Sequence, residues 1–345
     1  MRNRPFIVIP NLPDIILRRV FSYLLYEDLL NCELVCKRWQ NLVLRTMKQD
    51  IHEIVIEQLS NCEVQIIQQP ALKRLTITCQ KDSYEFIAGI VRRSQNSLER
   101  LTADLNFFTN IHRVNLLHKE GRYKYFPNTQ NLWIVVTNCE DNDLENLKKI
   151  EDRLFSNLHC LTFQAHVKQS QIQNISTLLM IFLNKYKNLE VNIELHADKS
   201  SPILAQLGEL CNLRMKQLKI ICTDFDRPIF PLDGLRDIMV KNKLDCDRLV
   251  LRDWYLHCNG GEPVGTGCLS SIRISSSTIG NTTSFVSAIK KTKENSLLNK
   301  LEMVGLCIFS DINYLNDKAH LEFEHRVNCN LNGLIIDCND IYYVC

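Results

Sequence analysis

Most of this chain alternates short apolar segments with longer amphipathic ones. Each short segment places two apolar residues around one other residue, a period of two that is typical of a β-strand with one buried face. The segments recur at intervals of about 29 residues. Ile54/Ile56 is a candidate strand ahead of ten further pairs, which are Leu75/Ile77, Leu101/Ala103, Leu132/Ile134, Leu161/Phe163, Leu189/Val191, Leu218/Ile220, Leu249/Leu251, Ile272/Ile274, Leu301/Met303 and Leu334/Ile336.

The segments between these strands carry apolar residues three and four positions apart, which is the period of an amphipathic helix. The predicted helices are Tyr84–Arg93, Asp143–Leu154, Ile172–Leu183, Ile203–Cys211, Leu235–Val240 and Phe285–Ile289. Two stretches lack this pattern and are predicted as loops, Phe107–Pro127 and Trp254–Gly267. The second contains several glycines but lacks the Gly-Lys-Ser/Thr ending of a phosphate-binding loop.

A regular strand–helix repeat predicts an α/β solenoid, because one repeat cannot bury its apolar side chains alone and must stack on its neighbours. The period is that of a leucine-rich-repeat solenoid, with a parallel sheet on the concave face and helices on the convex face. Residues 51–345 would form this irregular solenoid of about ten repeats. The C-terminal Ile341–Val344 segment is expected to cover the open end of the stack. The alternative is an ordinary α/β domain in which strands and helices alternate.

The N-terminal segment Leu12–Leu42 follows a different pattern and predicts three short helices. Pro13 suits a first helical turn, and Asp14 places negative charge at the positive end of the helix dipole. Apolar residues then follow with helical spacing, and Val35, Cys36, Trp39 and Leu42 carry a third helix. A unit of this size rarely holds a core alone. We therefore expect part of its apolar surface to be covered by another molecule or domain.

The spacing of these residues resembles the F-box over about 31 positions, which places an F-box domain at residues 8–50. The shared pattern is LP-x-x-I-L-x-x-V-F-S-Y-L, then D-L-L, then V-C-K-R-W-x-x-L. Ile15 departs from the family pattern, which usually has an acidic residue at this position. In the family this position mostly faces solvent. A plain helical hairpin that caps the next domain would explain the apolar stripe, but it would not explain LP and VCKRW at this spacing.

The resemblance implies that this domain docks on the Skp adaptor of a cullin–RING (SCF) ubiquitin ligase. In the family the adaptor contacts the apolar faces of the F-box helices. The matching residues here are Leu12, Pro13, Ile16, Leu17, Val20, Phe21, Leu24, Leu29, Leu30, Val35, Cys36 and Trp39. The repeats resemble those of F-box proteins of the leucine-rich class.

Composition narrows the remaining classes of function. The formal net charge of +2 gives no electrostatic argument for a nucleic-acid partner. No apolar run approaches the length of a membrane span, and we expect no secretion signal, because the first residues lack its apolar segment. The fifteen cysteines are scattered without a CxxC pair, so we expect no metal and interpret them as reduced, buried side chains in the cytosol or nucleus. Neither a cofactor nor a catalytic motif is indicated, so a binding protein rather than an enzyme is expected.

The outward-facing side chains of the predicted strands would form the substrate surface. Trp133 is the large aromatic residue there, either as a binding anchor or packed beneath the Phe107–Pro127 loop. Later strands are more basic and are opposed by Glu302. We expect an acidic or phosphorylated segment of the substrate to bind the cations Lys219, Arg248, Arg252, Arg273 and Lys300. An ordinary solvated face with the same charges is the alternative.

Together these patterns predict a substrate-recognition subunit of an SCF ubiquitin ligase, which binds the adaptor and presents a protein for ubiquitination and proteasomal degradation. Such a subunit acts by tethering and performs no bond chemistry itself. An F-box scaffold that binds the adaptor or other proteins outside any ligase is the first alternative. The second is an enzyme hidden in the solenoid, which would need a clustered site with perturbed pKa values.

Overall fold

The structure, a computed structural model, separates into two compact units. It describes residues 12–24, 26–49, 53–56, 72–77, 91, 94–109, 126–137, 141–148, 154–166, 172–186, 188–198, 207, 210–259, 262–309, 331, 333–339 and 342–344. Unit 1 comprises Met1–Ala103, Ile111–Gln130 and Arg153–Asn157, and unit 2 comprises Asp104–Asn110, Asn131–Asp152 and Leu158–Cys345. The predicted boundary between the F-box and the repeats, at residue 50, rests on a change in the sequence pattern. The two units are instead defined by which residues lie close together in space, so the two divisions differ.

Unit 1 begins with three helices, as the sequence predicts. They are α1 (Asp14–Phe21), α2 (Tyr26–Glu33) and α3 (Lys37–Gln49). Their shared core contains the buried residues Leu17, Phe21, Leu29, Leu42 and Val43. The same unit contains the parallel strands β1 (Glu53–Ile56), β2 (Arg74–Ile77) and β3 (Arg100–Asp104). Strand β1 confirms the candidate strand at Ile54/Ile56.

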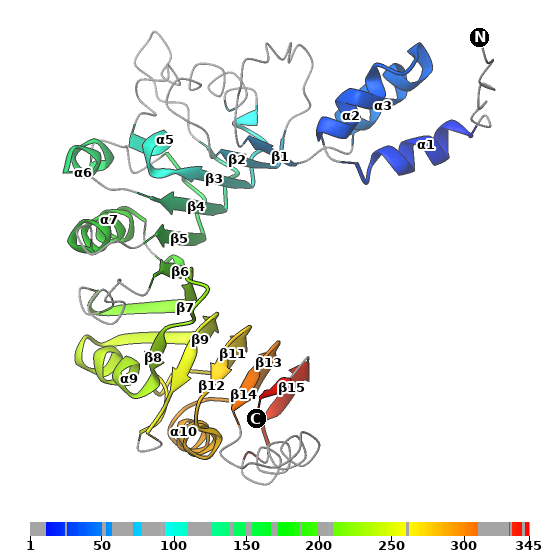
Figure 1. Cartoon of the computed structure of the whole chain (residues 1–345). Coiled ribbons are helices and arrows are strands. Elements are labelled where there is room, and N and C mark those ends of the chain that lie inside the picture. The colour runs from blue at the N-terminus through cyan, green and yellow to red at the C-terminus, as the bar shows by residue number, and fades with distance from the viewer. Residues whose placement is uncertain are drawn as a thin grey trace. The chain divides into compact units, whose positions relative to one another are not determined.

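Unit 2 contains a parallel sheet whose strands follow one another in sequence order (Figure 1). The order is β4 (Asn131–Val136), β5 (Cys160–His166), β6 (Glu190–Ala197), β7 (Leu213–Cys222), β9 (Leu244–Arg252), β11 (Ser271–Ser275), β13 (Lys300–Val304) and β15 (Ile335–Asn339). Each strand therefore begins one repeat of a solenoid-like α/β arrangement.

A second, smaller parallel sheet runs beside the ends of the later repeats. Its strands are β8 (Ile229–Pro231), β10 (Tyr255–His257), β12 (Thr278–Ile279), β14 (Cys307–Phe309) and β16 (Tyr342–Val344). Trp254 and β10 lie in a stretch that the sequence predicts as a loop, so that prediction was wrong there. The loop prediction failed because it relied on the glycines, while Trp254 and Leu256 are buried apolar residues.

Helices line one side of the unit 2 sheet (Figure 1). They are α6 (Asp141–Lys148), α7 (Ile172–Lys185), α9 (Leu232–Lys241) and α10 (Thr282–Asn295), and the sequence predicts all four. A short helix, α5 (Leu105–Thr109), extends into the first residues of the predicted loop Phe107–Pro127, so the loop prediction was wrong there. Phe107 and Phe108 are fully buried. Most of the predicted helices Tyr84–Arg93 and Ile203–Cys211, and most of the Phe107–Pro127 loop, lie outside the described residues.

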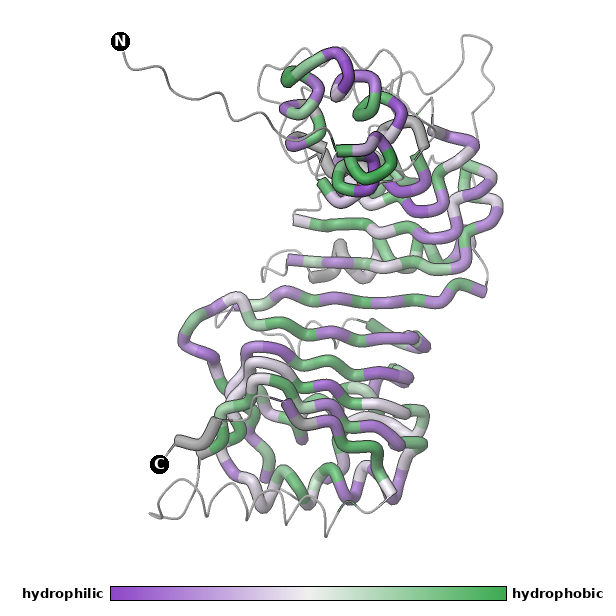
Figure 2. The backbone as a smooth tube through the Cα atoms, turned by 90° about the vertical axis from the view of Figure 1, so that its right-hand side faces the viewer, coloured by the Kyte–Doolittle hydropathy of each residue, from purple (hydrophilic) through white to green (hydrophobic). Residues whose placement is uncertain are grey.

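The strands alternate between buried and outward side chains, which Figure 2 shows as alternating colours along the tube. One buried row runs across the strands through Ile134, Phe163, Ile193, Leu218 and Leu249. The outward side chains form what we call the open face, the side of the sheet away from α6, α7, α9 and α10. In the part of the chain that the structure describes, no helix is long and apolar enough to cross a membrane.

Strand β6 corrects the sequence-based register by two residues. The pair predicted there was Leu189/Val191, but Val191 and Ile193 pair with Leu161 and Phe163 of β5. Leu189 precedes the strand. The open-face residues of β6 are consequently Asn192, Glu194 and His196.

Trp254 links the two sheets of unit 2 from within the core. Its side chain is only 3% exposed, and its indole Nε1 donates a hydrogen bond to the Ile220 carbonyl at 3.1 Å. The ring also packs on Phe230, with 5.2 Å between ring centroids. Both contacts are inside the fold, so Trp254 is expected to contribute to stability rather than to binding.

Replacing Trp254 by Phe should lower the free energy of unfolding by about 1–3 kcal/mol, because the hydrogen bond and part of the ring volume are lost. Urea denaturation followed by far-UV circular dichroism measures the change. Phe225→Ala is the control, since Phe225 is fully exposed and should shift the value by less than about 0.5 kcal/mol. Equal losses in both variants would contradict the assignment of Trp254 to the core.

Candidate protein-binding surfaces

Helix α1 has two apolar stripes, and only one of them is used inside the protein. Leu17 and Phe21 are one helical turn apart and are 4% and 1% exposed. Ile16 and Val20 are also one turn apart, yet each is 46% exposed. Leu12, just before the helix, continues the second stripe and is 36% exposed. We call Leu12, Ile16 and Val20 the α1 stripe.

The α1 stripe is held in place from beneath by α3. Arg38 donates hydrogen bonds to Asp14 Oδ1 from Nε at 2.9 Å and from Nη2 at 2.7 Å, and its Nη2 also reaches the Leu12 carbonyl. Phe21 packs edge-on against Trp39, with 5.2 Å between ring centroids. The start and the end of α1 are thus both attached to α3. An exposed apolar stripe on a fixed helix is a ready docking surface, because little ordering is needed on binding.

The residues predicted to contact the adaptor divide into three groups. The exposed ones are Leu12, Pro13, Ile16, Val20, Val35 and Cys36. Leu24 and Trp39 are half-buried against the helical core, and Leu17, Phe21 and Leu29 lie within it. The side chain of Leu30 lies outside the described residues. Binding by the buried group would require the core to open, so the exposed group is the better candidate surface.

The sequence prediction left out two exposed apolar residues of this region, Tyr23 and Leu34. They are 75% and 84% exposed and lie in the turns that follow α1 and α2. Ile15, at 77% exposure, is consistent with the expectation that its position faces solvent. Tyr23 lies beyond the end of α1, so helical periodicity does not identify it, whereas Leu34 follows Leu30 by one helical turn and lies one residue past α2.

On the open face of unit 2, three of the predicted cations converge on one carboxylate. Glu302 on β13 forms ion pairs with Lys300 Nζ at 2.6 Å, with Arg248 Nη2 at 3.3 Å and with Arg273 Nη1 at 3.4 Å. The carboxylate side chain is 13% exposed, whereas the three cationic side chains are about 40% exposed. We call Arg248, Arg273, Lys300 and Glu302 the basic cluster.

The basic cluster keeps an excess of positive charge that solvent can reach. Hydrogen bonding from Lys300 lowers the pKa of Glu302, and the charges of Arg248 and Arg273 act in the same direction against its partial burial. Glu302 is therefore ionised at neutral pH. Three positive charges remain opposed by one negative charge, which leaves this part of the open face attractive to anions.

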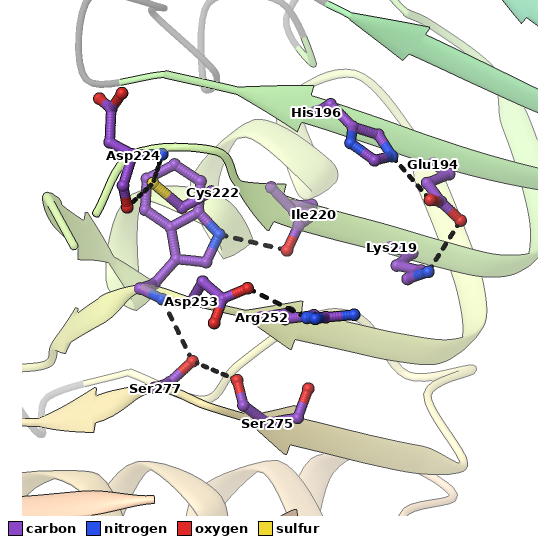
Figure 3. A network of polar contacts seen from close by, with 11 residues as sticks. Glu194, His196, Lys219, Ile220, Cys222, Asp224, Arg252, Asp253, Ser275 and Ser277 are labelled. Carbon is purple, nitrogen blue, oxygen red and sulfur yellow. Dashed lines mark hydrogen bonds and ion pairs between the residues drawn. The ribbon is translucent and has the colours of Figure 1, made fainter. Parts of the chain in front are cut away.

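The other two predicted cations have separate partners. Arg252 Nε pairs with Asp253 Oδ2 at 3.0 Å, and Lys219 Nζ pairs with Glu194 Oε2 at 2.9 Å (Figure 3). The predicted patch of five cations is thus a cluster of three with two neutralised neighbours. Trp133 lies on the open face as predicted and is half-buried.

A second polar network occupies the open face of β6 and β7. His196 Nε2 lies 2.7 Å from Glu194 Oε1, and Lys219 binds the other oxygen of that carboxylate (Figure 3). Burial raises the pKa of Glu194, but the hydrogen bonds from His196 and Lys219 outweigh it, so the net pKa is lowered. Glu194 and His196 were not among the predicted site residues, although the alternation of Val191, Ile193 and Leu195 marks them as outward-facing.

The buried cysteines among the described residues are core residues rather than metal ligands. Cys222, Cys246 and Cys258 are buried thiols, and burial raises the pKa of Cys246 to about 12. Within the described ranges, no group of three His, Cys, Asp or Glu side chains is placed to hold a metal ion. The buried thiols behave as small apolar core residues.

Comparison with known proteins identifies the N-terminal helices. The F-box-like family matches residues 9–48, which contain all of α1 and α2 and most of α3. Domains of this family in general bind the Skp adaptors of SCF ubiquitin ligases. The chain is also 33% identical to the uncharacterized F-box protein ZK328.6 of Caenorhabditis elegans, in an alignment that covers 97% of this chain and 98% of the relative. The chain therefore belongs to the F-box proteins.

The Glu194 carboxylate should contribute to stability in a pH-dependent way. Its folded-state pKa lies below the ordinary value of 4.5, so its contribution is fully present above pH 4.5 and is lost as the pH falls toward the folded-state pKa. Glu194→Gln should consequently lower the free energy of unfolding at pH 7, and the difference from the unaltered chain should shrink as the pH falls below 4.5. Urea denaturation at several pH values measures it, and a difference that does not change with pH would contradict this ionisation.

Proposed function

We propose that this chain is the substrate-recognition subunit of an SCF ubiquitin ligase. The α1 stripe is the observation that carries the proposal, because it leaves apolar residues exposed on a fixed helix of the F-box. Burying an apolar side chain of this size stabilises a complex by about 1.5–3 kcal/mol when fully desolvated. A Skp adaptor is the partner that fits this surface in an F-box protein, with cullin and the RING protein recruited through it.

In this proposal unit 2 belongs to the leucine-rich-repeat class and binds the protein to be ubiquitinated for proteasomal degradation. The chain acts without catalysis of its own, by raising the effective concentration of substrate near the ubiquitin-loaded enzyme. It needs no cofactor, and its place of action is the cytosol or the nucleus. Parallel strands with an open polar face support this division of roles, because they present many side chains over a continuous surface.

Adaptor binding is tested by Ile16→Asp combined with Val20→Asp. Both positions are exposed, so the helical core should remain folded, but a buried unpaired carboxylate would oppose complex formation. We expect co-purification of adaptor and cullin with the full chain to fall at least about tenfold, which corresponds to about 1.4 kcal/mol. Quantitative mass spectrometry of the purified complexes measures the loss.

Asn41→Asp is the matched control, since it introduces the same side chain at an exposed position of α3 about 200° around the helix from Trp39. It should leave co-purification unchanged. Normal recovery of the adaptor by the double variant would refute the role of the α1 stripe. Adaptor without cullin in the unaltered chain would instead identify a scaffold outside the ligase.

The basic cluster is proposed to capture an acidic or phosphorylated segment of the substrate. A phosphoryl group carries a charge of about −1.5 to −2 at pH 7, which matches the excess charge that Glu302 leaves uncompensated. The guanidinium groups of Arg248 and Arg273 can each offer two parallel donors to its oxygens. Since Glu302 already occupies the meeting point of the cations, a ligand must approach from the exposed side.

Reversing Arg248 and Arg273 to Glu together should remove substrate proteins from the purified complex while the adaptor and cullin remain. The expected loss is at least about tenfold, because attraction is replaced by repulsion at two positions. Proteins captured by crosslinking in cells are compared by quantitative mass spectrometry. Lys241→Glu with Lys290→Glu makes the same charge change on α9 and α10 and should have no effect. An unchanged set of captured proteins in the Arg variant would exclude the basic cluster.

A further inference from the structure

Three side chains on the open face of β4 and β5 form a hydrogen-bonded row. Trp133 Nε1 on β4 donates to Gln164 Oε1 on β5 at 3.1 Å. The other end of the same amide, Gln164 Nε2, lies 3.4 Å from Nε2 of His166, two residues further along β5. Gln164 thus contacts the aromatic residue with its oxygen and the imidazole with its nitrogen.

The direction of each hydrogen bond in this row follows from the first one. An indole N–H can only donate, so the amide oxygen of Gln164 must face Trp133. The amide NH₂ must then face His166, and Nε2 of His166 must accept. The row as a whole therefore requires a neutral His166 that carries its proton on Nδ1.

The surroundings of His166 favour the same neutral state. Its ring is tilted against that of His196 on β6, with 4.5 Å between ring centroids, and His196 is itself held by Glu194. Partial burial and the neighbouring His196 lower the pKa of His166, and the Glu194 charge only partly opposes them. Lys219 on β7 reaches this group only through Glu194. On the β4 side, the described residues 131–137 contain no titratable side chain.

We propose that protonation of His166 turns the Gln164 amide over and releases the indole of Trp133. A protonated imidazole presents N–H at Nε2, which cannot face the amide NH₂. Rotating the amide gives its oxygen to His166, but it then points NH₂ at the indole N–H, where two donors meet. Gln164 is in this sense a positioning residue, which fixes the Trp133 ring while His166 is neutral.

The coupling of His166 to Trp133 through Gln164 makes the open face sensitive to pH in the range where histidine titrates. Because the folded-state pKa of His166 is lowered from 6.5, Trp133 is held above pH 6.5 and is released as the pH falls through the folded-state value. If Trp133 contacts the substrate, a step that rests on the proposed function, substrate binding changes over the same range. The conformational change itself requires no partner.

Nuclear magnetic resonance of the full chain, labelled with ¹⁵N in tryptophan and ¹³C in histidine, tests the proposal directly. The chain has three tryptophans, so the indole signal of Trp133 is assigned by its absence in Trp133→Phe, and the His166 ring signal by its absence in His166→Gln. Between about pH 7.5 and about pH 5, the Trp133 indole signal should shift with the same midpoint as His166. The signals of Trp39 and Trp254 should not follow that midpoint.

Two variants separate the proposed coupling from a general effect of pH. His166→Gln should abolish the titration of the Trp133 signal, and Gln164→Ala should abolish it while His166 still titrates. His159→Gln, which removes an exposed histidine before β5, should leave it unchanged. A Trp133 signal that titrates in either of the first two variants would overturn the proposal. The same holds if the signal stays constant while His166 protonates, or if His166 stays neutral throughout in the folded chain. None of these outcomes bears on adaptor or substrate capture, which fails or succeeds separately.

Discussion

The stacking of repeats is the constraint on which the structure of unit 2 depends. No single repeat could bury its own apolar side chains, so each depends on the register of its neighbours. Leu218, Leu249, Ile272 and Leu301 pair successively in one buried row. A slip of one residue in any strand would move such a row to solvent and bring charged side chains into the core. The positions of all outward residues are fixed as a consequence.

The same register brings charged residues from distant parts of the sequence together on the open face. Arg273 pairs with Glu302 across β11 and β13, and Glu194 pairs with Lys219 across β6 and β7. Side chains at paired positions of neighbouring strands are close enough to interact, so each carboxylate meets a cation without any loop to position it. The cations around Glu302 are about 40% exposed, so these pairs mainly hold side chains in defined positions, whereas Glu194 and Lys219, at 11% and 26% exposure, form a more buried pair.

The spacing of apolar residues predicted most strands of the main sheet, but it could not fix the register of a strand that contains several equivalent apolar doublets. Strands β4, β5, β7, β9, β11 and β13 appear at the predicted pairs because each apolar doublet is flanked by polar residues. At β15 the predicted pair Leu334/Ile336 was two residues early, since Ile336 and Cys338 pair with Leu301 and Met303 of β13. At β6 the run Leu189, Val191, Ile193 and Leu195 offers several equivalent doublets, and only pairing with β5 selects between them. That ambiguity concealed Glu194, and with it the partner that neutralises Lys219. Ion pairing between repeats depends on three-dimensional register, which one sequence does not display.

The F-box helices show a related limit, because apolar residues that form a core and apolar residues that bind a partner look alike in sequence. Ile16 and Leu17 are adjacent and chemically similar, yet one points to solvent and the other into the core. Only the packing of α1 against α3 distinguishes them. In the proposed function the two surfaces would bind by different physics. Binding at the α1 stripe would exclude water and tolerate changes in salt, whereas binding at the basic cluster would act through charge, which salt screens over about 8 Å. The proposal thus assigns the salt-tolerant contact to the adaptor and the more readily exchanged contact to the substrate.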